Sequence, residues 1–126
     1  MSDSEILRMY VAYLAACNDR DWETIAGCVH SSVLVNGIQR TQEEYLDDIR
    51  KTIAVFPDYA WELRHTVEQA PWLAVHLHDT GTRHQTFLDA AGDLARVETD
   101  EFVMYRIADG RIAELWGTPD NARLSL

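Results

Sequence analysis

The fold of this chain is decided by residues 101–116, Glu101-Phe-Val-Met-Tyr-Arg-Ile-Ala-Asp-Gly-Arg-Ile-Ala-Glu-Leu-Trp116. The pair Asp109-Gly110 stands between two apolar segments, which is a strong short-range signal of a β-hairpin. The sequence therefore predicts two antiparallel strands, over residues 94–107 and 111–116, joined by a tight turn.

A single carboxylate, Asp120, follows this hairpin just beyond Pro119. The end of a strand is a rigid place to hold an acid or a base. Burial beside the indole of Trp116 would raise the pKa of the carboxyl toward the working range of a general base. The alternative is a carboxylate that caps a short final turn over residues 121–124. Asp120 is the first candidate for a catalytic residue.

Two more strands are predicted on the N-terminal side of the hairpin, because hydrophobicity there has a period of two. They cover residues 61–68 and 73–87, and the second is expected to be bent or bulged near Gly81. In the first strand the residues expected to share one face are Trp61, Leu63, His65 and Val67.

The first half of the chain has helical spacing. An amphipathic helix is predicted over residues 4–17, and Asp21 is expected to cap a short second helix that ends at Ser31-Ser32. A short strand, Val33–Val35, and a turn at Asn36-Gly37 follow. Thr41-Gln-Glu-Glu44 is a capping box that begins a third helix.

Helices followed by a run of strands indicate an α+β fold. We expect a cone-shaped α+β barrel in which three N-terminal helices pack on a strongly curved, mostly antiparallel sheet. A pocket would then lie between the two layers.

Composition limits the classes of function. The chain has 126 residues, expected to form one domain over residues 1–126, and 47% of its residues are hydrophobic. It contains no apolar run long enough to span a membrane and no secretory signal near its first residue. The net charge of −10 would repel phosphate backbones, so nucleic-acid binding is not expected. Cys17 and Cys28 are expected to be free thiols, which fits a cytoplasmic protein.

Glu101 is a second candidate carboxylate. Strand alternation places Glu101, Val103 and Tyr105 on one face, with Phe102 and Met104 on the other. If the first set lines the pocket, Glu101 would lie near Asp120. Otherwise Glu101 stands at a frayed strand end and meets water.

His76 and His78 share one strand face, two residues apart. A His-x-His pair can bind zinc, but a zinc site needs a third ligand, and none has an obvious position. The two histidines can instead donate hydrogen bonds to a carbonyl of a substrate. The remaining interpretation is that they are solvated or paired across strands.

Aromatic residues can supply the wall of a pocket. Tyr10, Tyr13, Trp61 and Trp116 would do so, although aromatic side chains at helical spacing more often belong to the core. Asn36 can contact a ligand or can simply form a turn with Gly37. The sequence has no glycine-rich phosphate loop and no nucleophile motif, so no cofactor is expected.

Four segments of the chain resemble the SnoaL-like polyketide (ester) cyclases of the nuclear-transport-factor-2-like superfamily. They are residues 10–22, Ala70-Pro71-Trp72, Gly81-Thr82-Arg83 with Phe87, and residues 105–116 with Pro119-Asp120. Together they span nearly the whole chain.

The resemblance implies that Asp120 is a general acid/base. It would remove a proton from a carbon activated by neighbouring carbonyls, and the ring would close by intramolecular aldol attack. No metal or cofactor is implied, because the substrate itself delocalises the enolate. Glu101 stands where the best-known members have a glutamine, and Val103 where they have a histidine. Arg83 stands where a histidine often follows Gly-Thr. These departures change the groups that would stabilise an enolate oxygen.

The first helix is also similar to that of ketosteroid isomerases, in which a tyrosine at the place of Tyr10 donates to the enolate. Their general base falls at Asn36 and their second oxyanion donor at Val103. An amide takes no proton at neutral pH, so steroid isomerisation by that mechanism is not expected.

The leading hypothesis is a cofactor-independent enzyme of the cyclase type, with Asp120 as acid/base and a small hydrophobic carbonyl compound as ligand. Tyr10, His76 and Trp116 are the expected pocket residues around Asp120. The alternatives are a non-catalytic binding or association domain, or a dehydratase, isomerase or hydrolase on the same fold. Apolar positions on both faces of the late strands predict a homodimer.

Overall fold

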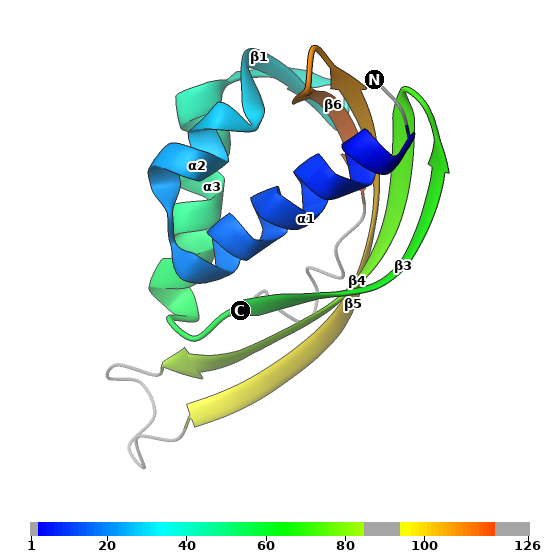
Figure 1. Ribbon diagram of the computed structural model, residues 1–126. Coiled ribbons are helices and arrows are strands. Elements are labelled where there is room, and N and C mark those ends of the chain that lie inside the picture. The colour runs from blue at the N-terminus through cyan, green and yellow to red at the C-terminus, as the bar shows by residue number, and fades with distance from the viewer. Residues whose placement is uncertain (1–2, 85–93, 118–126) are drawn as a thin grey trace.

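The computed structural model describes residues 3–84 and 94–117 of the chain, and within them it forms three helices and six strands (Figure 1). In chain order these are α1 (Asp3–Asp19), α2 (Trp22–Gly27), β1 (Val29–Val35), β2 (Ile38–Thr41), α3 (Gln42–Val55), β3 (Ala60–Gln69), β4 (Trp72–His84), β5 (Leu94–Ala108) and β6 (Arg111–Gly117). All three helices lie on the concave side of the curved sheet, so the predicted α+β architecture is confirmed.

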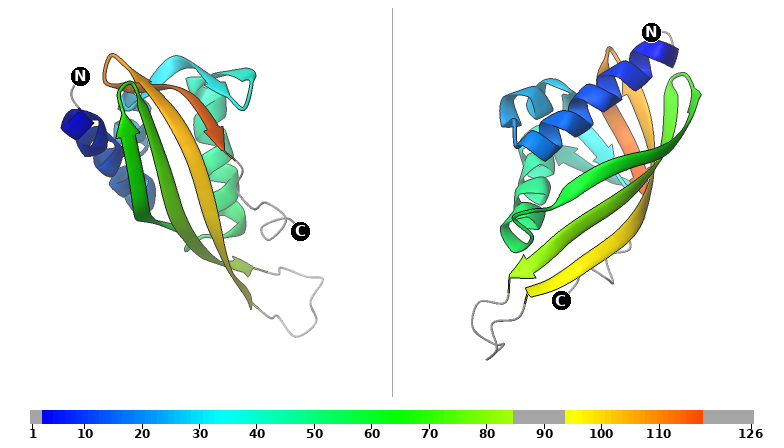
Figure 2. Two further views of the ribbon diagram at one scale, coloured as in Figure 1. Left: turned by 90° about the vertical axis from the view of Figure 1, so that its right-hand side faces the viewer. Right: turned by 60° about the horizontal axis from the view of Figure 1, so that its bottom comes forward.

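The sheet has the order β2-β1-β6-β5-β4-β3 (Figure 2). Every pair is antiparallel except β1 with β6, which brings the first strand beside the last. The β4–β5 ladder is the longest and runs without a register shift from Trp72↔Arg106 to His84↔Leu94. The two long strands therefore form the wall on which candidate site residues are arranged.

The predicted starts of α2 and α3 are confirmed. The Asp21 side chain accepts a hydrogen bond from the Thr24 backbone and caps α2. Thr41 and Glu44 form the reciprocal capping box that begins α3. Each cap satisfies N–H groups that would otherwise lack a partner at the helix end.

Two turns were also predicted correctly. Asp109 and Gly110 have φ angles of 54° and 74°, the left-handed conformation that a tight hairpin requires. Asn36 and Gly37 have φ angles of 50° and 85° and join β1 to β2. The strand β2 itself was not predicted, and β1 begins four residues earlier than expected, so Ser31 and Ser32 lie within it.

The predicted alternation along β3 holds only for its first part. A register shift between Leu63 and His65 reverses which side chains face inward. Val67 is consequently 72% exposed, whereas Thr66 and Glu68 are half-buried. The expectation that Val67 shares the inner face with Trp61 and Leu63 is wrong for this reason.

Gly81 serves close packing rather than a bulge. The β4–β5 register passes through it without a shift. A Cβ at this position would lie 2.9 Å from Cδ1 of Tyr59 and 3.1 Å from Cβ of Phe56. The glycine therefore lets the segment before β3 pack directly on β4.

The core fills the space between the helices and the concave face. Its largest fully buried side chains include Tyr10, Ile6, Ile25, Leu73, Leu77 and Ile112. No helix in the described ranges, 3–84 and 94–117, is long and apolar enough to cross a membrane.

Candidate functional site

A cavity of about 210 Å³ lies between helices α1 and α3 and the concave face of the sheet. Aromatic and aliphatic side chains form most of its wall. The lining includes Tyr13, Tyr45, Tyr59, Trp61, Glu101 and Tyr105. A cavity of this volume suits a compact ligand or one ring of a larger one, since drug-sized ligands occupy roughly 300 Å³ or more.

Tyrosine hydroxyls supply hydrogen-bonding groups to this cavity. The hydroxyls of Tyr13 on α1 and Tyr45 on α3 are 2.6 Å apart, and Tyr10 donates to the Tyr105 hydroxyl at 3.4 Å. Burial raises the pKa of all four phenols. They therefore stay neutral and can serve as hydrogen-bond donors, but not as bases, near neutral pH.

Two carboxyl groups lie on the inner face of adjacent strands. On β4 the inward alternation of Leu73, Val75 and Leu77 continues to Asp79, which is 1% exposed. On β5 Glu101 faces the cavity. Leu77 pairs with Glu101 in the β4–β5 register, so Asp79 is the diagonal neighbour of Glu101 on the same face.

Tyr59 completes this group. Its hydroxyl donates to Oδ2 of Asp79 at 2.8 Å, while Oδ1 of Asp79 accepts no hydrogen bond from the described residues within ordinary geometry. Arg20, at the end of α1, donates to the backbone oxygens of Pro57 and Tyr59 at 3.0 and 2.8 Å. These bonds fix the segment that presents the Tyr59 ring to Asp79.

The environment keeps this pair of carboxyls from ionising together. Burial, followed by the interaction with Asp79, raises the pKa of Glu101 to about 9. Burial also raises the pKa of Asp79, against the opposing effects of the neighbouring Glu101 carboxyl and of the hydrogen bond that Tyr59 donates. Because Asp79 is the member that Tyr59 stabilises as an anion, Glu101 is the neutral acid at pH 7.

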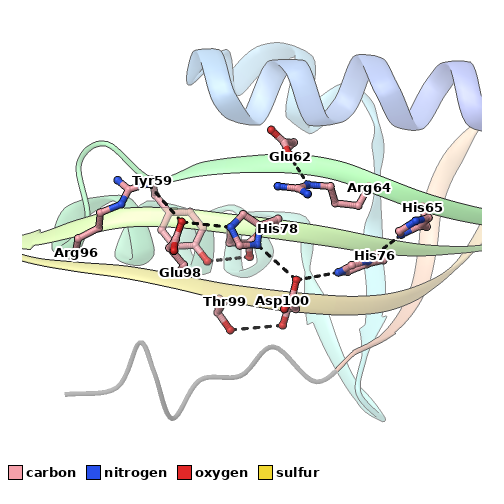
Figure 3. Close-up of polar contacts among 11 residues, drawn as sticks. Tyr59, Glu62, Arg64, His65, His76, His78, Arg96, Glu98, Thr99 and Asp100 are labelled. Carbon is pink, nitrogen blue, oxygen red and sulfur yellow. Dashed lines mark hydrogen bonds and ion pairs between the residues drawn. The ribbon is translucent and has the colours of Figure 1, made fainter.

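The two predicted histidines lie on the other face of the sheet. The ring of His76 stacks on His65 and on Phe102. Its Nε2–H donates to Oδ1 of Asp100 at 2.9 Å (Figure 3). His78 contacts Asp100 as well, at 3.5 Å. Strand alternation directs both away from the cavity, so they are cross-strand-paired residues of the outer face.

Asn36 and Trp116 also lie on the outer side. Both line a depression of about 510 Å³ on the convex face, and Trp116 is 42% exposed. Oδ1 of Asn36 accepts from the backbone N–H of Gly117 at 2.8 Å, which ties the β1–β2 turn to the end of β6. The indole donates to Glu114 at 2.7 Å.

The predicted site residues therefore separate into two groups. Tyr13, Trp61 and Glu101 line the inner cavity, and Tyr10 is buried immediately behind it. The residues on the outer face are Asn36, His76, His78 and Trp116. The expectation that Trp116 and His76 join one pocket with Tyr10 is wrong, because they lie on opposite faces of the sheet. Asp120 lies outside the described residues.

No group of three or more His, Cys, Asp or Glu side chains is arranged to hold a metal ion in residues 3–84 and 94–117. The histidine-rich part of the outer face is instead satisfied by Asp100 and Glu98.

Sequence reasoning missed Asp79 and Tyr59. The signal for Asp79 was present, since it continues the inward alternation that begins at Leu73. For Tyr59 there was no comparable signal, because its position depends on Arg20 and Gly81, which are distant in the sequence.

Comparison with known proteins gives a consistent result. A family model described as SnoaL-like polyketide cyclase matches residues 6–125. A SnoaL-like polyketide cyclase from Agrobacterium tumefaciens C58, known from a crystal structure, is 27% identical with a TM-score of 0.83, and the match covers 98% of this chain and 96% of that chain.

Two further solved structures show the fold alone. IdmH from Streptomyces antibioticus has a TM-score of 0.84 at 23% identity over 94% of both chains. TsrD from Streptomyces laurentii has a TM-score of 0.81 at 20% identity, over 98% of this chain and 94% of that chain. No curated protein matches the chain.

Proposed function

Because this chain belongs to the SnoaL-like polyketide cyclase family, we propose that it is a cofactor-independent enzyme that acts on a small hydrophobic carbonyl compound in the inner cavity. One observation supports this proposal above the others. The cavity combines an aromatic wall with tyrosine hydroxyls and a carboxylic acid that burial keeps neutral. Such a surface binds an apolar molecule and offers hydrogen bonds to its oxygen atoms.

In the proposed reaction Asp120 is the general acid/base. It removes a proton from a carbon next to a carbonyl, and the resulting enolate closes a ring by intramolecular aldol attack on a second carbonyl. The assignment rests on the resemblance and on the position of Asp120, which follows the end of β6 at Gly117. The family supplies the reaction type but does not identify the substrate.

The test compares Asp120→Asn with Asp109→Asn over a panel of carbonyl compounds that carry an acidic carbon. We expect Asp120→Asn to lower turnover by about 10²-fold or more, as loss of a general base does. Asp109 is an exposed turn residue with φ of 54°, which asparagine also adopts, so its variant should retain full turnover.

Equal turnover of Asp120→Asn and the wild type would contradict the acid/base role. Binding of panel members without turnover by the wild type would favour the second candidate, a non-catalytic small-molecule binding domain.

We also propose a homodimer formed through the convex face. Large apolar side chains are exposed there, namely Val67, Phe102, Met104 and Trp116. They surround the outer depression on neighbouring strands. Exposed apolar surface that is contiguous in this way typically mates with another protein surface.

Light scattering at micromolar concentration tests this arrangement. The wild type should have the mass of a dimer, and Met104→Glu should have the mass of a monomer, because the added charge lies in the apolar face. Val11→Glu is the matched control, since Val11 is an exposed valine on α1, and it should remain dimeric. A monomeric wild type would contradict the proposal.

A cytoplasmic location is the last part of the proposed function. Cys17 and Cys28 are free, and burial raises the pKa of the Cys17 thiol to about 12, so it is not reactive. Unpaired cysteines are typical of reducing compartments. Cell fractionation should recover the protein with cytoplasmic markers, and recovery with secreted proteins would contradict this location.

A further inference from the structure

We propose that Glu101 is the acid of the ring-closing step: Asp79 holds it protonated, and it transfers that proton to the carbonyl oxygen under attack. This inference rests on the proposed function, and it names a second group that acts on the substrate in addition to Asp120. It also limits the class of substrate.

Geometry supplies the first support. Glu101 lines the cavity from β5, and Asp79 is its diagonal neighbour on β4. Asp79 is 1% exposed, and Tyr59 donates to its Oδ2. Its Oδ1 is also buried and has no hydrogen-bond partner of ordinary geometry among the described residues. A buried carboxylate oxygen in this situation is stabilised by a proton donor. The Glu101 carboxylic acid is the adjacent group that can provide one.

Charge supplies the second support. Six titratable groups on the inner side of the pair are neutral near pH 7, because burial raises the pKa of each: Tyr59, Tyr10, Tyr13, Cys17, Tyr45 and Tyr105. Asp48 lines the same cavity. From the outer face, the charge interaction with His78 lowers the pKa of Asp79 and that with Asp100 raises it. Among the described residues no Lys or Arg lines the cavity beside Asp79 and Glu101, so these two adjacent carboxyls retain one proton between them.

The same charges indicate which ligands the cavity accepts. Asp48 and Glu101 are the only Asp, Glu, Lys or Arg side chains among the described residues that line it. Because no Lys or Arg is among them and the carboxyl pair carries one negative charge, a neutral ketone or ester is favoured over a free carboxylate.

Each electron pair and each proton in the proposed step has a defined destination. The enolate carbon bonds to the second carbonyl carbon, and the π electron pair of that carbonyl moves onto its oxygen. The alkoxide so formed is a far stronger base than a carboxylate, so it takes the proton from Glu101. Asp120 meanwhile holds the proton removed from carbon. Glu101 and Asp79 are then both carboxylates. Their repulsion favours the return of a proton to Glu101 from Asp120 or water.

The first experiment follows ionisation directly and needs no substrate. Carboxyl carbons of Asp and Glu are labelled with ¹³C, and their NMR shifts are recorded from pH 4 to 10 for the intact wild-type protein. Glu101 should titrate with a midpoint near 9, far above its ordinary value of 4.5. A Glu101 midpoint near the ordinary value would overturn the proposal, whatever the result obtained with Asp120→Asn.

Variants then assign the cause. Asp79→Asn should lower the Glu101 midpoint by about one pH unit or more, since the neighbouring negative charge is gone. Tyr59→Phe is a milder variant in case Asp79→Asn does not fold. Without the hydroxyl the Asp79 anion is less stable, so Asp79 gains a larger share of the proton and the Glu101 midpoint falls. Asp100→Asn is the matched control on the outer face and should leave the midpoint nearly unchanged. A midpoint that neither inner variant moves would overturn the role of Asp79.

The second experiment uses the panel compounds that the wild type turns over. Turnover should decline as pH rises through the Glu101 midpoint, and Glu101→Gln should lower it about 10²-fold or more. In Asp79→Asn the declining limb should move to lower pH together with the NMR midpoint, which a merely structural defect would not do. Unchanged turnover of Glu101→Gln overturns the acid role while leaving that of Asp120 intact. If no panel compound is turned over, the proposed function fails and the acid role fails with it.

Discussion

The concave and convex faces of β4 and β5 give opposite environments to the same kind of side chain. Asp100 and Glu101 are consecutive, yet they point to opposite faces. Hydrogen bonds from His76 and His78 lower the pKa of the exposed Asp100, whereas burial raises the pKa of Glu101 to about 9. Whether a carboxyl group on these strands is ionised at neutral pH is therefore decided by the face on which it lies rather than by the residue type.

The two faces also differ in how they satisfy their polar groups. On the convex face half-buried histidines pair with exposed carboxylates (Figure 3). On the concave face a single tyrosine holds the Asp79 carboxylate. Exposed pairs contribute little stability, whereas buried polar groups are costly unless a partner is present. A ligand that supplies a hydrogen bond would therefore stabilise the folded protein more on the inner face than on the outer face.

The largest expected difference between the faces is in packing. Leu77→Ala should lower the free energy of unfolding by about 2–5 kcal/mol, because it removes most of a fully buried side chain and leaves a cavity in its place. His78→Ala, at the next residue on the outer face, should lower it by only ~0.5 kcal/mol or less. Urea denaturation of both variants measures the contrast, and equal losses would contradict the assignment of faces.

The next largest effect is in the pH dependence of stability. The pKa of Glu101 is raised in the folded state, so its contribution is fully present below the unfolded value, near 4.5, and is lost as pH rises through about 9. Wild-type stability should therefore fall between pH 6 and 9, by at most ~1.4 kcal/mol for each pH unit.

Glu101→Gln removes the ionisable group and should flatten this decline. Thermal unfolding of the wild type and the variant at several pH values provides the measurement. A wild type whose stability is constant from pH 6 to 9 would refute the buried acid.

A smaller effect is expected from the tyrosine hydroxyls of the inner face. Tyr13→Phe removes the hydrogen bond between Tyr13 and Tyr45, whose oxygens are 2.6 Å apart, and leaves the Tyr45 hydroxyl without that partner. The free energy of unfolding should fall by about 0.5–1.5 kcal/mol. An unchanged midpoint in urea would mean that this bond adds nothing to stability.

The smallest effect belongs to the outer face. The pKa of Asp100 is lowered, so its contribution is present above the unfolded pKa and is lost as pH falls through the folded value. Asp100→Asn should therefore weaken the loss of stability in acid only slightly, because the group is exposed. Thermal unfolding of the wild type and the variant at acid pH detects this effect. An effect on stability as large as that of Glu101→Gln would contradict the difference between the two faces.

The sequence predicted much of this arrangement, and the reasons for the exceptions are local. Period-two alternation placed Glu101 and Tyr105 on one face of β5 and Met104 on the other, as the structure confirms. The same rule failed on β3, because the register shift at Leu63/His65 cannot be recognised without the partner strand.

Alternation cannot decide which face of a strand meets the helices when both carry apolar residues. That choice separated His76 and Trp116 from the cavity. The carboxyl pair depends on the register between β4 and β5, which long-range pairing sets. Sequence patterns identify a strand face, but they do not identify its neighbour.

The central claim is that the ligand binds on the concave side of the sheet. The most direct measurement maps acetophenone, a neutral carbonyl probe, by NMR of ¹³C-labelled methyl groups. Methyl signals of Val35 and Leu77, which line the inner cavity, should shift with added probe. Those of Val67 and Met104, at the outer depression, should stay unchanged. Shifts confined to Val67 and Met104, or no shifts at all, would contradict the account.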